Sequence, residues 1–177
     1  MLETVGRRIR TVPDFPKPGI SYKDITPLIE DGGALHAATD ALHRATKHLH
    51  YDRILSAEAR GFVFGTALAY RARKGLILAR KPNKLPRETI TASYDLEYGT
   101  DALEAHADSV SKGARVLVAD DLLATGGTSR AMCDLVENAG GTVAGVAFLI
   151  ELGYLDGRAR LKPYEVVSLI TYPTPDD

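Results

Sequence analysis

Residues 116–138 read VLVADDLLATGGTSRAMCDLVEN, and this stretch decides the fold. Its first four residues are apolar with a branched bias, which is typical of a buried strand in a parallel sheet. Asp120 and Asp121 follow, and the small residues 124–128 predict a turn. A helix is predicted next, because apolar residues recur at helical spacing at Met132, Leu135, Val136 and Ala139. Gly140-Gly141 is a typical helix end.

This arrangement predicts a site for a phosphorylated sugar. Backbone N–H groups of residues 125–128 can surround phosphate oxygens, and the positive end of the following helix reinforces them. Asp120 and Asp121 would repel a phosphate, but they can accept hydrogen bonds from the two vicinal hydroxyls of a ribose, with a metal ion nearby. An ordinary strand-to-helix turn, with glycine only for tightness, is the alternative. No Gly-Lys-Ser/Thr follows, so the loop is not a nucleoside-triphosphate P-loop.

Length, composition, net charge and cysteine content limit the classes of protein to which this chain can belong. The chain has 177 residues and is 45% hydrophobic, which suits a single domain spanning residues 1–177. A net charge of −1 gives no electrostatic reason to expect a nucleic-acid partner. Neither a membrane-spanning run nor a secretory signal is recognisable. The lone cysteine, Cys133, cannot form an internal disulfide, so we expect a cytoplasmic protein.

Hydrophobic periodicity predicts an α/β fold. We expect helices over residues 2–10, 34–50 and 62–73, and strands over 52–57, 75–78, 142–152 and 166–170. Strand, helix and strand between residues 52 and 78 form a βαβ unit, which requires a parallel sheet. Loops at the carboxyl ends of parallel strands share one rim, so residues 58–61 should lie beside the Asp120 loop. Arg60 in that loop is suited to bidentate capture of phosphate oxygens.

Four stretches resemble a known family. The segment ADDLLATGGT (119–128) resembles the phosphoribosyl-pyrophosphate (PRPP) signature of type I phosphoribosyltransferases. The segments FPKPGISYKDITPL (15–28), EARGFVFG (58–65) and RKPNKLPRETITASYDLEYGTDALEAH (80–106) are similar to adenine phosphoribosyltransferases. The resemblance spans roughly residues 9–152 and implies a parallel sheet with helices on both faces. It also implies an N-terminal hood at about residues 9–28 and a mobile hairpin lid at about residues 80–106.

The resemblance implies that the 5-phosphoribosyl group of PRPP is transferred to N9 of adenine, giving AMP and pyrophosphate. For ribose and 5′-phosphate, the implied residues are Asp120, Asp121, Ala124, Thr125, Gly126, Gly127 and Thr128. Those implied for pyrophosphate are Glu58, Ala59, Arg60, Arg80, Lys84 and Tyr98, and those for adenine are Ser21, Tyr22, Lys23 and Leu152. Glu97 and Arg60 are the implied catalytic residues. Mg²⁺ is expected to be held by PRPP itself, with Asp120 and Asp121 nearby and no direct protein ligand.

The resemblance carries further expectations. It implies a cis peptide between Glu58 and Ala59, and a homodimer in which the basic limb 80–84 reaches the neighbouring subunit. Asn83 stands where the family pattern has glycine, but asparagine tolerates a left-handed backbone, so we expect the turn to survive. Ala119 stands where a bulkier apolar residue is usual.

Two other functions share part of this pattern. A PRPP-sensing regulator would use the same loop without chemistry, but it would need a nucleic-acid-binding surface, for which the short segment before the hood leaves no room. A salvage enzyme for 6-oxopurines would be expected to carry a lysine near the final strand of the site. Residues 145–156 contain no lysine, so adenine is the expected base.

Overall fold

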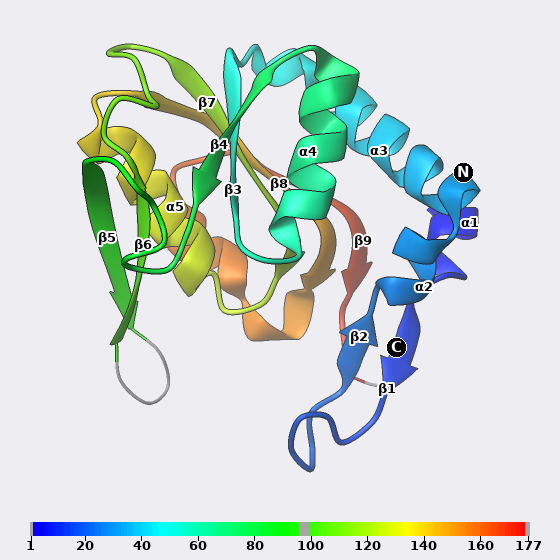
Figure 1. The fold of residues 1–177 in the computed structure, drawn as a ribbon. Coiled ribbons are helices and arrows are strands. Elements are labelled where there is room, and N and C mark those ends of the chain that lie inside the picture. The colour runs from blue at the N-terminus through cyan, green and yellow to red at the C-terminus, as the bar shows by residue number, and fades with distance from the viewer. Residues whose placement is uncertain (1, 96–99, 176–177) are drawn as a thin grey trace.

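A five-stranded parallel sheet forms the centre of the computed structural model, which describes residues 2–95 and 100–175 (Figure 1). The strands are β3 (Arg53–Ala57), β4 (Gly75–Ala79), β7 (Arg115–Leu123), β8 (Thr142–Leu152) and β9 (Val166–Tyr172), in the order β4-β3-β7-β8-β9. All four neighbouring pairs are parallel, which confirms the predicted fold class. The carboxyl ends of the three central strands therefore meet at one rim.

Helices cover both faces of this sheet, as predicted (Figure 1). Helices α3 (Gly32–Thr46) and α4 (Gly61–Ala72) pack on one face, where Leu117 and Ala119 of β7 point. Helix α5 (Gly127–Asn138) packs on the other face, against Val116 and Val118. Successive residues of β7 thus enter two different cores, because side chains alternate along a strand.

The N-terminal region is built differently from its prediction. Helix α1 (Leu2–Gly6) is shorter than the predicted 2–10, because Arg10 already begins strand β1 (Arg10–Val12). That strand pairs antiparallel with β2 (Tyr22–Asp24), and the proline-rich residues 13–19 connect the two. Helix α2 (Thr26–Glu30) follows. The hood region is therefore a small two-stranded sheet beside the carboxyl end of the main one (Figure 1).

The limits of two central elements also differ from the prediction. Helix α3 begins at Gly32, before the predicted Ala34, because the Asp31 side chain caps it by accepting from the Ala34 N–H at 3.0 Å. It ends at Thr46, and a 3₁₀ turn, η1 (Lys47–Leu49), takes the place of the predicted last turn. Strand β7 continues through the acidic pair to Leu123, because the long strand β8 stays paired with it there.

The insertion between β4 and β7 contains the antiparallel hairpin of β5 (Thr89–Asp95) and β6 (Thr100–His106). Its middle is packed rather than loose, since the paired residues Ala92 and Leu103 are buried in the core beneath α5. Asn83 adopts φ +64°, so the expected left-handed turn is present with asparagine in it. Among the described residues, no helix combines the length and apolar character needed to cross a membrane.

Candidate active site

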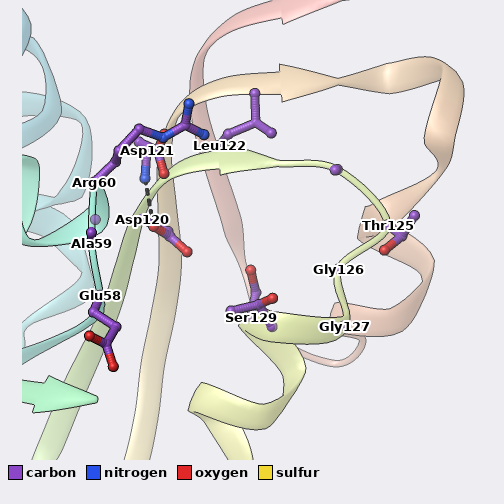
Figure 2. Close-up of a pocket in the computed structure, with 13 residues that line it drawn as sticks. Glu58, Ala59, Arg60, Asp120, Asp121, Leu122, Thr125, Gly126, Gly127 and Ser129 are labelled. Carbon is purple, nitrogen blue, oxygen red and sulfur yellow. Dashed lines mark hydrogen bonds and ion pairs between the residues drawn. The ribbon is translucent and has the colours of Figure 1, made fainter. Parts of the chain in front are cut away.

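A polar cavity of about 450 Å³ opens at the carboxyl ends of β3 and β7. It is lined by residues 58–61, 120–122 and 124–129, so the structure brings together the two loops that the sequence placed on one rim. Figure 2 shows the Gly126–Gly127 turn on one side of the hollow and Ala59–Arg60 on the other. The fold thus holds a glycine-rich turn, a helix N-terminus and two carboxylates around one space.

The turn after β7, which we call the phosphate loop (residues 124–128), has the geometry that the sequence predicts. Gly126 adopts φ +83°, a left-handed conformation that glycine reaches without strain, and it directly precedes the first residue of α5. The first N–H groups of a helix have no partner within the helix, so they are open to an anion from the cavity. The helix ends as predicted, with Gly140 at φ +81° and the Gly141 N–H donating to the Val136 carbonyl at 2.9 Å.

The two carboxylates lie in different surroundings. Asp121 is buried, and its Oδ2 lies 2.9 Å from Nε of Arg60. Asp120 accepts a hydrogen bond from the Asp121 backbone N–H at 2.9 Å (Figure 2). Burial, and next the neighbouring charge of Asp121, raise the pKa of Asp120 well above its ordinary value. A ligand that donates hydrogen bonds or brings a cation would therefore relieve an unfavourable pair of charges.

The Glu58 loop carries the expected cis peptide between Glu58 and Ala59. The Glu58 carboxylate turns toward the base of the insertion, where it accepts from the backbone N–H of Lys81 and from Nη2 of Arg80 at 3.1 Å. The hydrogen bond from the Lys81 N–H, and to a smaller extent the one from Arg80, lowers the pKa of Glu58. Partial burial acts in the opposite direction but does not cancel this effect. Glu58, Ala59 and Arg60 line the polar cavity, whereas the pyrophosphate candidates Arg80 and Lys84 are not among its described lining residues.

A second, more apolar cavity, also of about 450 Å³, lies under the hood. The adenine candidates Ser21, Tyr22, Lys23 and Leu152 all line it. Four residues line this apolar cavity and the polar cavity alike, namely Arg60, Leu122, Ala124 and Thr125. The two cavities are therefore neighbouring parts of one site.

Tyr22 links the hood to the polar cavity. Its hydroxyl accepts a hydrogen bond from the guanidinium of Arg60, whose central carbon lies 5.4 Å from the centre of the Tyr22 ring. Phe15 packs edge-on against the same ring at 5.1 Å between centroids. The buried Lys23 turns instead toward β9, with Nζ 4.4 Å from the Tyr172 ring centre. Arg60 thus contacts the hood and the acidic pair at once.

Sequence reasoning missed part of the apolar wall. Leu122, Tyr154 and Leu155 line the apolar cavity. Leu122 lies inside the ADDLLATGGT segment but was assigned no role, and Tyr154 and Leu155 lie outside all four quoted segments. Tyr154 and Leu155 follow the carboxyl end of β8, so the rule that loops at this rim bind ligands could have found them. Glu97 and Tyr98, the other two candidates, lie outside the described residues. Among those that are described, no three histidine, cysteine, aspartate or glutamate side chains are arranged to hold a metal ion.

Comparison with known proteins identifies the family. Residues 34–172 match the family model of the phosphoribosyl transferase domain. The adenine phosphoribosyltransferase of Rubrobacter xylanophilus is 68% identical over 175 residues, covering 98% of this chain and 95% of that protein. The crystal structure of the Thermoanaerobacter pseudethanolicus enzyme of the same name superposes with a TM-score of 0.95 at 50% identity, covering 97% of this chain and 100% of that one.

A more distant crystal structure extends the comparison to a eukaryote. The Saccharomyces cerevisiae adenine phosphoribosyltransferase, complexed with an imino-altritol bisphosphate and adenine, has a TM-score of 0.90 at 33% identity. It covers 95% of this chain and 97% of its own. With a matching family model over most of its length and relatives of this identity, the chain belongs to the adenine phosphoribosyltransferase family of phosphoribosyl transferases.

Proposed function

We propose that this protein transfers the 5-phosphoribosyl group of PRPP to N9 of adenine, giving AMP and pyrophosphate in purine salvage. One observation carries the proposal: a polar cavity with an anion-binding loop adjoins an apolar cavity, and the two share four lining residues. AMP is itself a purine joined to a ribose phosphate, so its two halves match the two cavities in chemistry and in order.

In the polar cavity, Asp120 and Asp121 accept from the ribose hydroxyls, and backbone N–H groups of the phosphate loop hold the 5′-phosphate. The loop at Glu58–Ala59 and the guanidinium of Arg60 hold pyrophosphate, with Arg80, Lys84 and Tyr98 contributing charge and hydrogen bonds. Arg60 exchanges its ion pair with Asp121 for pyrophosphate oxygens. This exchange keeps the arginine paired both before and after binding.

In the apolar cavity, the ring of Tyr22 and the side chain of Leu152 pack against the purine. Backbone groups around Ser21 and Lys23 read its edge. A backbone carbonyl accepts from the 6-amino group of adenine but faces another acceptor, O6, in hypoxanthine. Two buried acceptors that face each other cost about 1–3 kcal/mol, so adenine is preferred.

The reaction breaks the bond between C1 of the ribose and a pyrophosphate oxygen, which keeps the electron pair. N9 of adenine forms the new bond to C1 and gives up its proton. Mg²⁺, bound through PRPP oxygens, would supply electrostatic stabilisation to the departing pyrophosphate. Asp120 and Asp121 fit a place beside that ion, because carboxylate oxygens suit Mg²⁺ and both line the cavity.

The lid (residues 80–106) serves this chemistry in two ways. Closure of the hairpin over the site excludes water, which would otherwise attack the cationic sugar. Glu97 takes up or shuttles the N9 proton, or stabilises the positive charge at C1. A Glu97→Gln variant keeps the size of the side chain and removes its basicity. We expect kcat to fall by about 10²–10⁴-fold with PRPP affinity unchanged; turnover within about threefold of wild type would contradict both roles.

We further propose that the protein is a cytoplasmic homodimer. Cys133 is a buried free thiol, which suits a reducing compartment. The hairpin already packs beneath α5 in its own chain, so the dimer is proposed from the family resemblance, which implies that the basic limb at residues 80–84 reaches the partner subunit. Sedimentation at assay concentrations tests this, and an active monomer would contradict it.

The function itself is tested by pyrophosphate release from PRPP in the presence of adenine, hypoxanthine, guanine or orotate. We expect release with adenine alone. Efficient use of hypoxanthine would contradict the assignment of the base. PRPP binding without release for any base would instead indicate a sensor.

A further inference from the structure

Residues 153–161, which we call the backing segment, lie directly behind the phosphate loop (Figure 1, orange). They form two 3₁₀ turns after β8, η2 (Gly153–Leu155) and η3 (Gly157–Leu161). A Cβ atom on Gly126 would lie 2.6 Å from the carbonyl oxygen of Gly157, and one on Gly157 would collide with the carbonyl oxygen of Ala124. The two backbones are therefore in contact with no space for a side chain between them.

The same segment forms part of the apolar cavity. Tyr154 and Leu155 line that cavity, while Gly157, two residues further on, touches the phosphate loop. A displacement of the segment would therefore disturb the wall of the apolar cavity and the support of the phosphate loop together.

One ion pair ties the backing segment to the sheet. Glu151, near the end of β8, is 5% exposed and receives two hydrogen bonds from Arg158, at 2.6 Å from Nε and 2.7 Å from Nη2. Arg158 also donates to the carbonyl of Val166 at 2.9 Å and to the Ser168 hydroxyl at 3.4 Å. One guanidinium thus fixes the segment to β8 and β9. A lysine cannot reproduce this fork of donors.

We propose that the Glu151–Arg158 pair positions both halves of the substrate site by holding the backing segment against the phosphate loop. The inference rests on the proposed function, since it assigns the pair to that site. In the part of the chain that the structure describes, neither side chain lines either cavity, so both are positioning residues rather than catalytic ones.

The proposal predicts a specific kinetic signature. When the segment loosens, the phosphate loop and the apolar wall lose their shape before substrates bind, and binding has to restore it. The KM values for PRPP and for adenine should therefore rise together. Once both substrates are bound the site is restored, so kcat should change less. A general loss of stability would lower the amount of active enzyme and leave both KM values unchanged.

The test uses three variants and one matched control, all compared at a temperature where each is folded by circular dichroism. Arg158→Gln removes the pair, Arg158→Lys keeps the charge without the fork, and Gly157→Ala disturbs the contact while leaving the pair intact. Arg71→Gln is the control, because Arg71 is equally exposed (49% against 47% for the Arg158 side chain) and pairs with Asp40 at 2.7 Å, away from both cavities.

We expect the three test variants to raise both KM values about five- to twentyfold and to weaken AMP binding by calorimetry to a similar extent. Their kcat should stay within threefold of wild type, and the control should stay within twofold throughout. Unchanged KM values in the folded variants, or equal losses in Arg71→Gln, would overturn the inference. If Arg158→Gln does not fold, the other two variants still decide the outcome. Turnover of the wild-type protein tests the proposed function separately, because the inference depends only on how the KM, kcat and AMP affinity of each variant compare with those of wild type.

Discussion

Nε of Arg60 lies 2.9 Å from Oδ2 of Asp121, and the guanidinium of the same arginine donates to the hydroxyl of Tyr22. One side chain therefore joins the loop after β3, the strand β7 and the hood before any ligand arrives. A ligand that binds Arg60 in the polar cavity competes with these two contacts. Binding in the polar cavity is thereby coupled to the wall of the apolar one.

The acidic pair is the first target for mutation. Changing Asp120 and Asp121 together to asparagine removes the two charged acceptors that we propose for the ribose hydroxyls, each expected to contribute about 1.5–3 kcal/mol. We expect kcat/KM for PRPP to fall at least about 100-fold, since 1.4 kcal/mol corresponds to a factor of ten. Steady-state pyrophosphate release measures this. Asp40→Asn on helix α3 is the control, and a double variant that behaves like it would refute the assignment.

Asp120 should also limit the stability of the free protein. Because burial raises its pKa in the folded state, folding favours the protonated form. This stabilisation is complete at pH values below the ordinary carboxyl pKa of the unfolded chain. It is lost as the pH rises from there through the raised pKa of the folded state. Asp120→Asn keeps the acceptor for the Asp121 N–H and removes the charge. The variant should therefore melt above wild type at pH 8 and show a smaller gain at pH 4, by thermal unfolding. A gain that is larger at pH 4 would contradict this sign.

The ring of Tyr22 should matter more than its hydroxyl for adenine. Tyr22→Ala removes the ring from the apolar cavity, and we expect KM for adenine to rise about tenfold or more, as burial of an aromatic side chain contributes a few kcal/mol. Tyr22→Phe keeps the ring and frees Arg60, so its adenine KM should stay within about threefold of wild type. Initial rates at saturating PRPP separate the two. An equal rise in the adenine KM of both variants would show that the contact with Arg60, rather than ring packing, controls adenine binding.

At Gly65, helix α4 packs tightly against strand β3 of the sheet. A Cβ there would lie 2.7 Å from Cβ of Ser56, whose hydroxyl donates to the Ala119 carbonyl at 2.7 Å. Gly65→Ala should therefore destabilise the protein by about 1–3 kcal/mol through overpacking. Gly32→Ala is the matched control, since a Cβ at that position meets nothing within 4 Å. Urea unfolding compares them, and equal midpoints would count against the packing argument.

The sequence predicts the elements of this fold better than their limits. The apolar runs at β3, β8 and helix α4 are long enough for their periodicity to define them. Residues 120–123 have mixed polarity and look like a loop, yet they stay in β7 because β8 offers a hydrogen-bonding partner through Glu151. A single sequence does not contain that information, because it depends on the length of a neighbouring strand.

In the binding site, too, local features can be predicted from the sequence and contacts between distant residues cannot. The phosphate loop can be predicted because its motif is local and chemically specific, whereas the hood is implied only by the family resemblance. The pairing of Arg60 with Asp121 joins residues 61 positions apart, and the contact of Gly126 with Gly157 spans 31. The rule that loops share one rim predicts that residues 58–61 lie near the Asp120 loop, but it does not predict which side chains pair or which backbones touch, because neither contact leaves a periodic or compositional signal.

The wall that the two cavities share has a consequence for inhibitor design. A compound that links a purine-like ring to an anionic sugar mimic would occupy both cavities while losing translational and rotational freedom only once. Joining two fragments in this way can raise affinity by about 10²–10⁴-fold over either fragment, provided that the linker fits the span. Since Arg60 and Thr125 stand at the junction, the linker itself can be given polar groups that both residues recognise.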